Sequence, residues 1–180
     1  MIHRLFKQLI FPRYIEAGVI LTRDELVYDI EFVTNRIARV VGVDDEGDTT
    51  KSASIITAEG KDNVDYIDRL IVSAVKELRG RTSWASGERG GRVASDVIPE
   101  NVEDWTLVFI LPVDWRGNGD VLCSRCHDYV KWSVISEWLK MVAPSMAATY
   151  ETNANDALDE VRYELRKQKM GGPVFYNLFK

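Results

Sequence analysis

Residues 120–166 decide the fold, and they read DVLCSRCHDYVKWSVISEWLKMVAPSMAATYETNANDALDEVRYELR. Apolar residues recur three and four positions apart on both sides of Pro144, which predicts two long helices joined at that proline. Asp120 is the expected cap of the first helix, which runs to about Val142. Its apolar residues cover more than one face: Leu122, Cys126, Tyr129, Val130, Trp132, Val134, Ile135, Trp138, Met141 and Val142. A helix of this kind is either central in its domain or shared between subunits.

The chain ends in an apolar tail, residues 171–180, which reads GGPVFYNLFK. The Gly-Gly-Pro break cannot continue a helix, because glycine is flexible and proline has no amide hydrogen to donate. The tail is too apolar for a solvated end, so we expect it to dock on its own domain or on a neighbour. The docking residues would be Val174, Phe175, Tyr176, Leu178 and Phe179.

Two more helices are expected upstream. The first of them begins with a capping box at Thr22 and is expected to end at Gly42. The second takes Asp62 or Asn63 as its cap and closes at Gly80.

One strand is clear from the sequence. Residues 105–111 are aromatic and β-branched and stop at Pro112, with residues 93–98 as a candidate hairpin partner. The first apolar segment, residues 5–21, is broken at Pro12 and is either a short extended arm or a short helix and a turn.

Together these elements predict a mainly α fold, a four-helix-bundle-like subunit with a short β-hairpin or strand and extended N- and C-terminal arms. We expect an N-terminal arm over residues 1–21 and a helical domain over residues 22–170. An insertion at about 81–112 interrupts that domain, and residues 171–180 form the docking tail. A length of 180 residues suits one well-cored domain.

Composition narrows the function classes. Hydrophobic residues make up 46% and charged residues 28%, as in ordinary globular chains. The net charge of -5 argues against a general nucleic-acid binder. No apolar run approaches the ~20 residues of a membrane-spanning helix, and the N-terminus lacks the pattern of a signal peptide. We therefore expect a protein of a cytoplasm-like compartment, with no membrane contact and with both cysteines as thiols.

One literal motif is present, Cys123-Ser124-Arg125-Cys126-His127, which matches the attachment signature of a c-type haem. The alternative is a helix with two small buried thiols and a polar histidine, which the surrounding Trp-rich pattern favours. A zinc site would need four ligands, and His3 is the only other histidine. We therefore expect neither cofactor nor metal.

The long stretch after residue 80 holds Arg81, Arg89 and Arg92 among glycines, so these arginines are candidate contacts to phosphate or to passing DNA. The acidic residues 44–48 lack the alternating ligands and the closing glutamate of a calcium loop. No nucleophile motif or phosphate-binding glycine loop occurs, so we do not expect an enzyme.

The order of several segments resembles structural proteins of tailed phages and prophages, particularly of Bacteroides-type hosts, and among them head–tail connector adaptors. The segments are Asp24–Val27, Asp65–Ala74, Leu111-Pro112, Tyr129–Trp132 with Trp138, Met146–Tyr150 and Leu158–Arg166. The resemblance covers residues 22–169 and is one of pattern and order.

The resemblance implies a virion protein, assembled in the host cytoplasm, that forms a ring beneath the portal, typically of twelve copies. The ring would join capsid to tail and let DNA pass through its channel during ejection. A C-terminal segment of such adaptors commonly reaches into the portal, a role that would fall here on the tail. The alternatives are a tail-completion or stopper protein of the phage neck and a redox or haem protein built on Cys123, Cys126 and His127.

Overall fold

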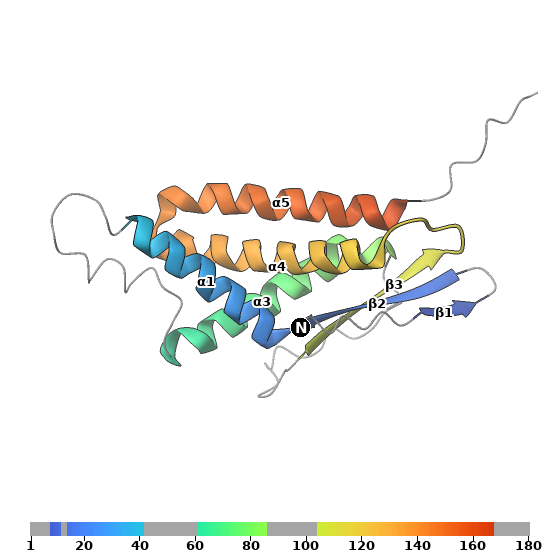
Figure 1. The fold of residues 1–180 in the computed structure, drawn as a ribbon, viewed down its shortest axis with the longest axis horizontal. Coiled ribbons are helices and arrows are strands. Elements are labelled where there is room, and N and C mark those ends of the chain that lie inside the picture. Colours follow the sequence, from blue (N-terminus) through green and yellow to red (C-terminus); the bar gives the residue numbers. More distant parts are fainter. Residues whose placement is uncertain (1–7, 12–13, 42–60, 86–103, 168–180) are drawn as a thin grey trace, which may run out of the picture.

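The computed structural model describes residues 8–11, 14–41, 61–85 and 104–167. The described chain is mainly helical, with a small antiparallel sheet at one end (Figure 1). Its elements are β1 (Gln8–Phe11), β2 (Tyr14–Thr22), α1 (Arg23–Val41), α3 (Lys61–Arg81), the short 3-10 helix η1 (Ser83–Ala85), β3 (Asp104–Pro112), α4 (Gly119–Val142) and α5 (Pro144–Arg166).

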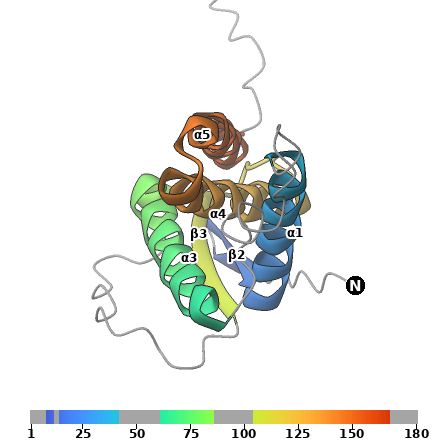
Figure 2. The ribbon, with the colours of Figure 1, turned by 90° about the vertical axis from the view of Figure 1, so that its left-hand side faces the viewer.

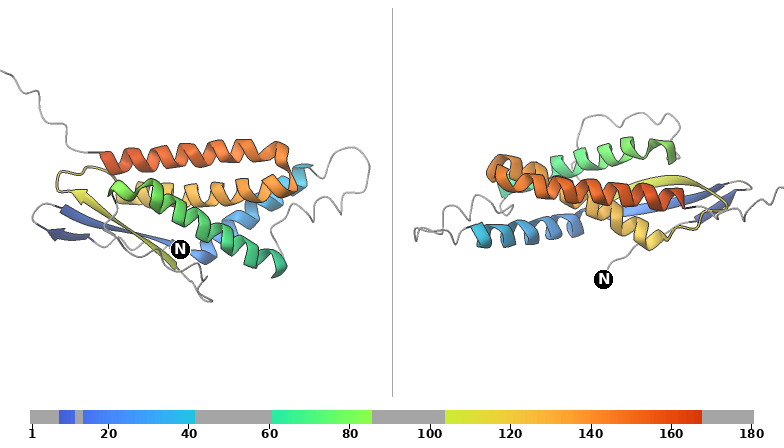
Figure 3. Two further views of the ribbon diagram at one scale, coloured as in Figure 1. Left: turned by 180° about the vertical axis from the view of Figure 1, so that it is seen from behind. Right: turned by 90° about the horizontal axis from the view of Figure 1, so that it is seen from above.

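Helix α4 lies at the centre of the described fold. Figure 2 shows α1 and α3 on opposite flanks of α4, with α5 on one side and the sheet on the other. The view from above in Figure 3 agrees, since α1 and α3 lie on either side of the α4–α5 pair. The buried residues of α4 point in several directions. They include Leu122, Cys126, Val130, Ile135 and Leu139. Most of the apolar surface predicted from the sequence is therefore buried inside the domain, whereas Met141 is exposed.

The sheet has the order β1-β2-β3, and both pairs are antiparallel. Side chains alternate along β2, so that Ile15, Ala17, Val19 and Leu21 are buried. The register sets Ala17 opposite Phe109 of β3, a small residue beside a large one on the same buried face.

This sheet corrects the expected domain plan. The predicted N-terminal arm, residues 1–21, includes the central strand of the sheet, because alternating apolar residues 15–21 bury one face against the helices. The strand at 105–111 is confirmed, but it pairs with β2 and belongs to the core rather than to an insertion at 81–112. The candidate partner at residues 93–98 lies outside the described residues.

Three predicted helix ends shift by a few residues. The cap of α4 is Asn118 instead of Asp120, and its side-chain oxygen accepts hydrogen bonds from the amides of Asp120 and Val121. Helix α3 starts at Lys61, ahead of the expected caps, and continues through Gly80 to Arg81. Pro144 opens α5 at its first turn, as predicted.

Polar contacts fix the α4–α5 pair at both ends. Near the proline turn, the Ser136 hydroxyl donates to the carbonyl of Ala147 at 3.2 Å. At the far end, the Trp115 indole donates to the carbonyl of Glu164 at 2.8 Å, and the buried Glu164 carboxylate accepts from the amide of Asn118 at 3.2 Å. These bonds tie the start of α4 to the end of α5, so the pair forms a rigid frame for the other elements. None of the helices in the described ranges is both long and apolar enough to cross a lipid bilayer.

Candidate functional site

A groove runs between α3 and α5, with α4 as its floor. Two hollows of about 290 and 440 Å³ form it, and Arg81 lines both of them. The first hollow involves α3, α4 and the start of α5, and the second lies between η1 and the end of α5. Because the two share a wall residue, we treat them as one continuous groove and call it the α3–α5 groove.

The floor of the groove is polar although it belongs to the most buried helix. Tyr129, Ser133 and Ser136 of α4 line the first hollow. Burial raises the pKa of the Tyr129 phenol, and the nearby Glu77 carboxylate raises it further. The phenol is therefore neutral and able to donate a hydrogen bond.

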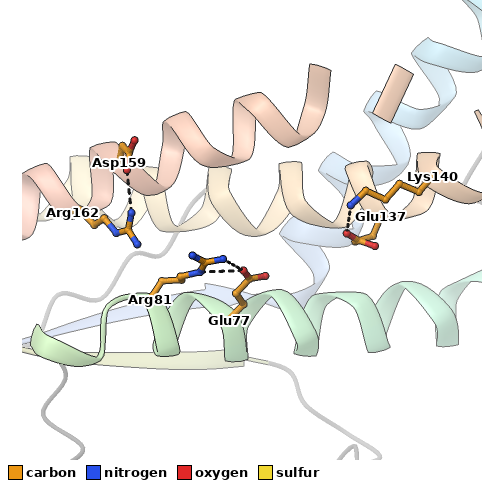
Figure 4. Close-up of polar contacts among 6 residues, drawn as sticks. All are labelled: Glu77, Arg81, Glu137, Lys140, Asp159 and Arg162. Carbon is orange, nitrogen blue, oxygen red and sulfur yellow. Dashed lines mark hydrogen bonds and ion pairs between the residues drawn. The ribbon is translucent and has the colours of Figure 1, made fainter. Parts of the chain in front are cut away.

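Ion pairs line the walls, as the close-up in Figure 4 shows. The Arg81 guanidinium is 3.0 Å from the Glu77 carboxylate on α3, and Arg162 is 3.2 Å from Asp159 on α5. The Lys140 ammonium is 2.7 Å from Glu137, a hydrogen bond that raises the pKa of this lysine. Arg81 and Arg162 point from opposite walls into the space between α3 and α5 (Figure 4).

Charge is distributed unevenly along the groove. The first hollow holds the carboxylates of Glu77, Glu137 and Glu151 together with Lys140 and Arg81. The second hollow holds the guanidinium groups of Arg81, Arg162 and Arg166 with the single carboxylate of Asp159. Near the α4–α5 turn, Lys140 is 2.7 Å from Glu137 and 3.7 Å from Glu151, which leaves one carboxylate in excess at this acidic end, whereas the end near η1 is basic.

Two aromatic side chains stand at the basic end. Trp84 is 53% and Tyr163 is 65% exposed, and both line the second hollow. The Arg166 guanidinium lies over the Trp84 ring, 5.2 Å from its centroid. Exposed aromatics next to arginine are the residue types that carry most binding energy at protein interfaces.

A second surface lies on the opposite flank, along α1. The exposed described residues of α1 are Asp24, Tyr28, Phe32, Arg36 and Arg39, which follow one another at spacings of four and three. Tyr28 is 66% and Phe32 58% exposed, and their rings stack with centroids 6.5 Å apart. We call these five residues the α1 stripe.

The predicted site residues have different outcomes. The tail residues Val174, Phe175, Tyr176, Leu178 and Phe179 lie outside the described residues, as do Arg89 and Arg92. Arg81 was expected in a loop but occupies the last turn of α3, because the helix continues through Gly80.

The Cys-x-x-Cys-His segment lies within α4, with Cys123, Cys126 and His127 all buried. Burial raises the pKa of the Cys126 thiol, so the reactive thiolate is disfavoured. A covalent haem needs both sulfurs and the histidine to reach a macrocycle, and Cys126 is 0% exposed in the core. The segment therefore fits the alternative of two small buried thiols, and haem does not fit it. The part of the chain that the structure describes holds no group of three or more potential metal ligands.

Sequence reasoning missed the aromatic members of both surfaces. Tyr28 and Phe32 fall among the polar positions of an amphipathic helix, outside the apolar stripe that the spacing of Leu26 and Ile30 defines. Two aromatics four residues apart on a polar face were the available signal. Trp84 and Tyr163 carried no such pattern, because they come from elements far apart in the sequence.

Comparison with known proteins adds no identification. No protein-family model matches the chain, and neither curated proteins nor solved structures include a significant match.

Proposed function

We propose that this protein is a structural virion subunit, a head–tail connector adaptor that assembles into a ring beneath the portal and joins capsid to tail. The observation that carries this proposal is the presence of two unlike surfaces on opposite flanks of α4. One is the α1 stripe, and the other is the α3–α5 groove with Trp84 and Tyr163.

Two different patches on one subunit favour head-to-tail contacts. In a two-fold dimer each copy uses the same patch, whereas a closed ring needs a pair of complementary patches that repeat around an axis. Opposite placement of the two patches across a rigid α4–α5 frame suits such repetition. The ring would have twelve copies if it follows the adaptors that the sequence resembles.

The finer architecture belongs to the same proposal. The subunit would be a four-helix-bundle-like adaptor with terminal arms, and Val174, Phe175, Tyr176, Leu178 and Phe179 would dock on the portal or a neighbouring neck protein. DNA would pass through the channel transiently. The net charge of -5 supports passage without sticking, since cationic contacts hold phosphate, and Arg89 and Arg92 are the proposed local contacts.

A tail-completion or stopper protein is the second candidate, and one observation favours it. Such a protein is expected to contain more β-structure than the single clear strand in the sequence, and β1 and β2 add two strands to that one. Both candidates are proteins of the phage neck, and direct binding to the portal is the property expected of the adaptor.

The experiment is native mass spectrometry of the full chain, alone and mixed with the portal and neck proteins of a phage that encodes it. A ring of many copies, or a complex that forms only with those proteins, supports the proposal. A chain truncated after Gly172 should keep its fold, judged by circular dichroism, and lose portal binding. A strict monomer that binds none of these proteins contradicts the proposed function.

A further inference from the structure

The α1 stripe carries charge of opposite sign at its two ends. Asp24 stands at the start, Tyr28 and Phe32 occupy the middle, and Arg36 and Arg39 stand at the end. The stripe faces outward, because the opposite face of α1, with Leu26, Ile30 and Ile37, is buried in the core. The stripe is thus an aromatic surface with an acidic and a basic end.

The α3–α5 groove also carries charge of opposite sign at its two ends, in the same acidic-to-basic order along α5 as along α1. Arg162 and Arg166 mark its basic end, beside Trp84, and Glu151 marks its acidic end with Glu137; Lys140 lies between these two glutamates, so one carboxylate is in excess there. An acidic helix end would meet the arginines and a basic helix end would meet the glutamates, provided that the helix runs antiparallel to α5. Charge complementarity at both ends fixes orientation, which aromatic contact alone would leave open.

The lengths also agree. Asp24 and Arg39 are fifteen positions apart on α1, and Glu151 and Arg166 are fifteen positions apart on α5. At the rise of an α-helix both separations correspond to ~22 Å. Charges placed at both ends of one surface therefore fall opposite their counterparts on the other.

We propose that the α1 stripe of one copy lies antiparallel to α5 in the α3–α5 groove of the next copy. This interface rests on the proposed function, because it specifies how neighbours in the ring would meet. Tyr28 of one subunit packs near Trp84 and Tyr163 of its neighbour, and Asp24 faces Arg162 and Arg166. Each subunit uses both surfaces once, so the contact repeats around a ring.

Cross-linking of chains that each carry one introduced cysteine tests the register, since the native Cys123 and Cys126 are buried. Tyr28→Cys mixed with Trp84→Cys should cross-link into heterodimers with a short bifunctional maleimide at protein concentrations high enough to offset the loss of these two rings, and so should Arg36→Cys mixed with Asn155→Cys, which keeps all four aromatic side chains. A chain carrying both Tyr28→Cys and Trp84→Cys should give a ladder of higher species. Val113→Cys, at a comparably exposed position on another part of the surface, is the matched control and should not cross-link to either.

Charge reversal tests the pairing of the ends. Asp24→Arg or Arg166→Glu alone should weaken association at least about tenfold, because like charges then face each other across the interface. A chain with both changes should recover part of the association, since the introduced arginine then faces the introduced glutamate, while Arg162 still lies opposite it. Both residues are exposed, so circular dichroism of each variant should match the wild type.

The outcomes separate the interface from the function. Rings or partner-induced assemblies whose cysteine pairs do not cross-link overturn this interface and leave the connector proposal standing. Homodimers of Tyr28→Cys alone, or Arg36→Cys linked to Trp84→Cys, contradict the head-to-tail register. A Tyr28→Cys monomer that resists maleimide shows that another part of the same chain covers the stripe, which also overturns the inference. A chain that stays monomeric with all neck proteins contradicts both proposals.

Discussion

Helices α4 and α1 differ in how much of their surface is buried by other parts of the chain. Helix α4 is apolar on several sides, yet α1, α3, α5 and the sheet surround it within one subunit. Helix α1 has one ordinary buried stripe, formed by residues such as Leu26 and Ile30, and displays Tyr28 and Phe32 to solvent. The sequence pointed to α4 as a candidate for sharing between subunits, and the exposed aromatics lie on α1.

Exposed aromatic residues indicate an assembly surface better than the total apolar content of a helix does. A helix that is apolar on several faces is covered on several faces, and all of the covering elements can belong to its own domain. Tyr28 and Phe32, on the polar face of an amphipathic helix, stack on each other and stay more than half exposed, and exposed apolar groups of this kind mark contact surfaces. Changes in α4 should therefore affect folding, and changes in the α1 stripe should affect association.

The largest effect is expected in α4. Ile135 is fully buried, so Ile135→Ala should lower the free energy of unfolding by about 2–5 kcal/mol through lost burial and a residual cavity. Met141→Ala, on an exposed position of the same helix, should change it by less than about 0.5 kcal/mol. Urea unfolding followed by circular dichroism measures both. Equal small losses would show that α4 is not the centre of the fold.

The next effect concerns the bond between the start of α4 and the end of α5. Glu164→Ala leaves the Asn118 amide without its carboxylate partner and should cost about 1–3 kcal/mol. Asp156→Ala, at an exposed position of the same helix, is the control and should be nearly neutral. Urea unfolding of the two variants measures this difference. Coincident midpoints would contradict the structural role given to Glu164.

A smaller, pH-dependent effect is expected at His127. Burial and then Lys131 lower the pKa of this histidine, while Asp29, 3.8 Å from its Nε2, and the Glu25 and Asp128 carboxylates oppose the shift. The neutral ring is favoured in the folded state, so its contribution is complete above the unfolded pKa of ~6.5 and declines as pH falls toward the folded pKa.

The measurement is the unfolding free energy of the wild type and of His127→Leu at pH 7.5 and pH 5.5. The wild type should lose more stability than the variant between these two pH values, because only the wild type takes up a proton at this position on unfolding. Parallel losses would contradict a buried neutral histidine.

The smallest effect on folding, and a large one on association, is expected in the α1 stripe. Tyr28→Ala and Phe32→Ala should each change the unfolding free energy by less than about 0.5 kcal/mol, because both side chains are more than half exposed. The same changes should weaken self-association at least about tenfold, as removal of a buried aromatic contact does. Sedimentation velocity across a concentration series measures this, and unchanged association would separate α1 from the interface.

The sequence predicted the helices better than their surroundings. Periodicity placed α1, α3, α4 and α5 within a few residues, and aromatic and β-branched residues placed β3. It failed at β2, because the alternation of residues 15–21 also fits an apolar arm until its partner strand is known, and that partner lies about 90 residues away. The α3–α5 groove was out of reach for the same reason, since it forms only when α3, η1 and α5 come together.

Complementation between two interface variants tests the central claim most directly. One chain carries Tyr28→Ala and Phe32→Ala and keeps its groove, while the other carries Trp84→Ala and Tyr163→Ala and keeps its α1 stripe. Native mass spectrometry should find each variant monomeric alone, and the equimolar mixture should form a heterodimer and nothing larger, because one intact pair of surfaces remains. Assemblies of the same size as the wild type in either variant alone, or no heterodimer in the mixture, would contradict head-to-tail contact through the two flanks.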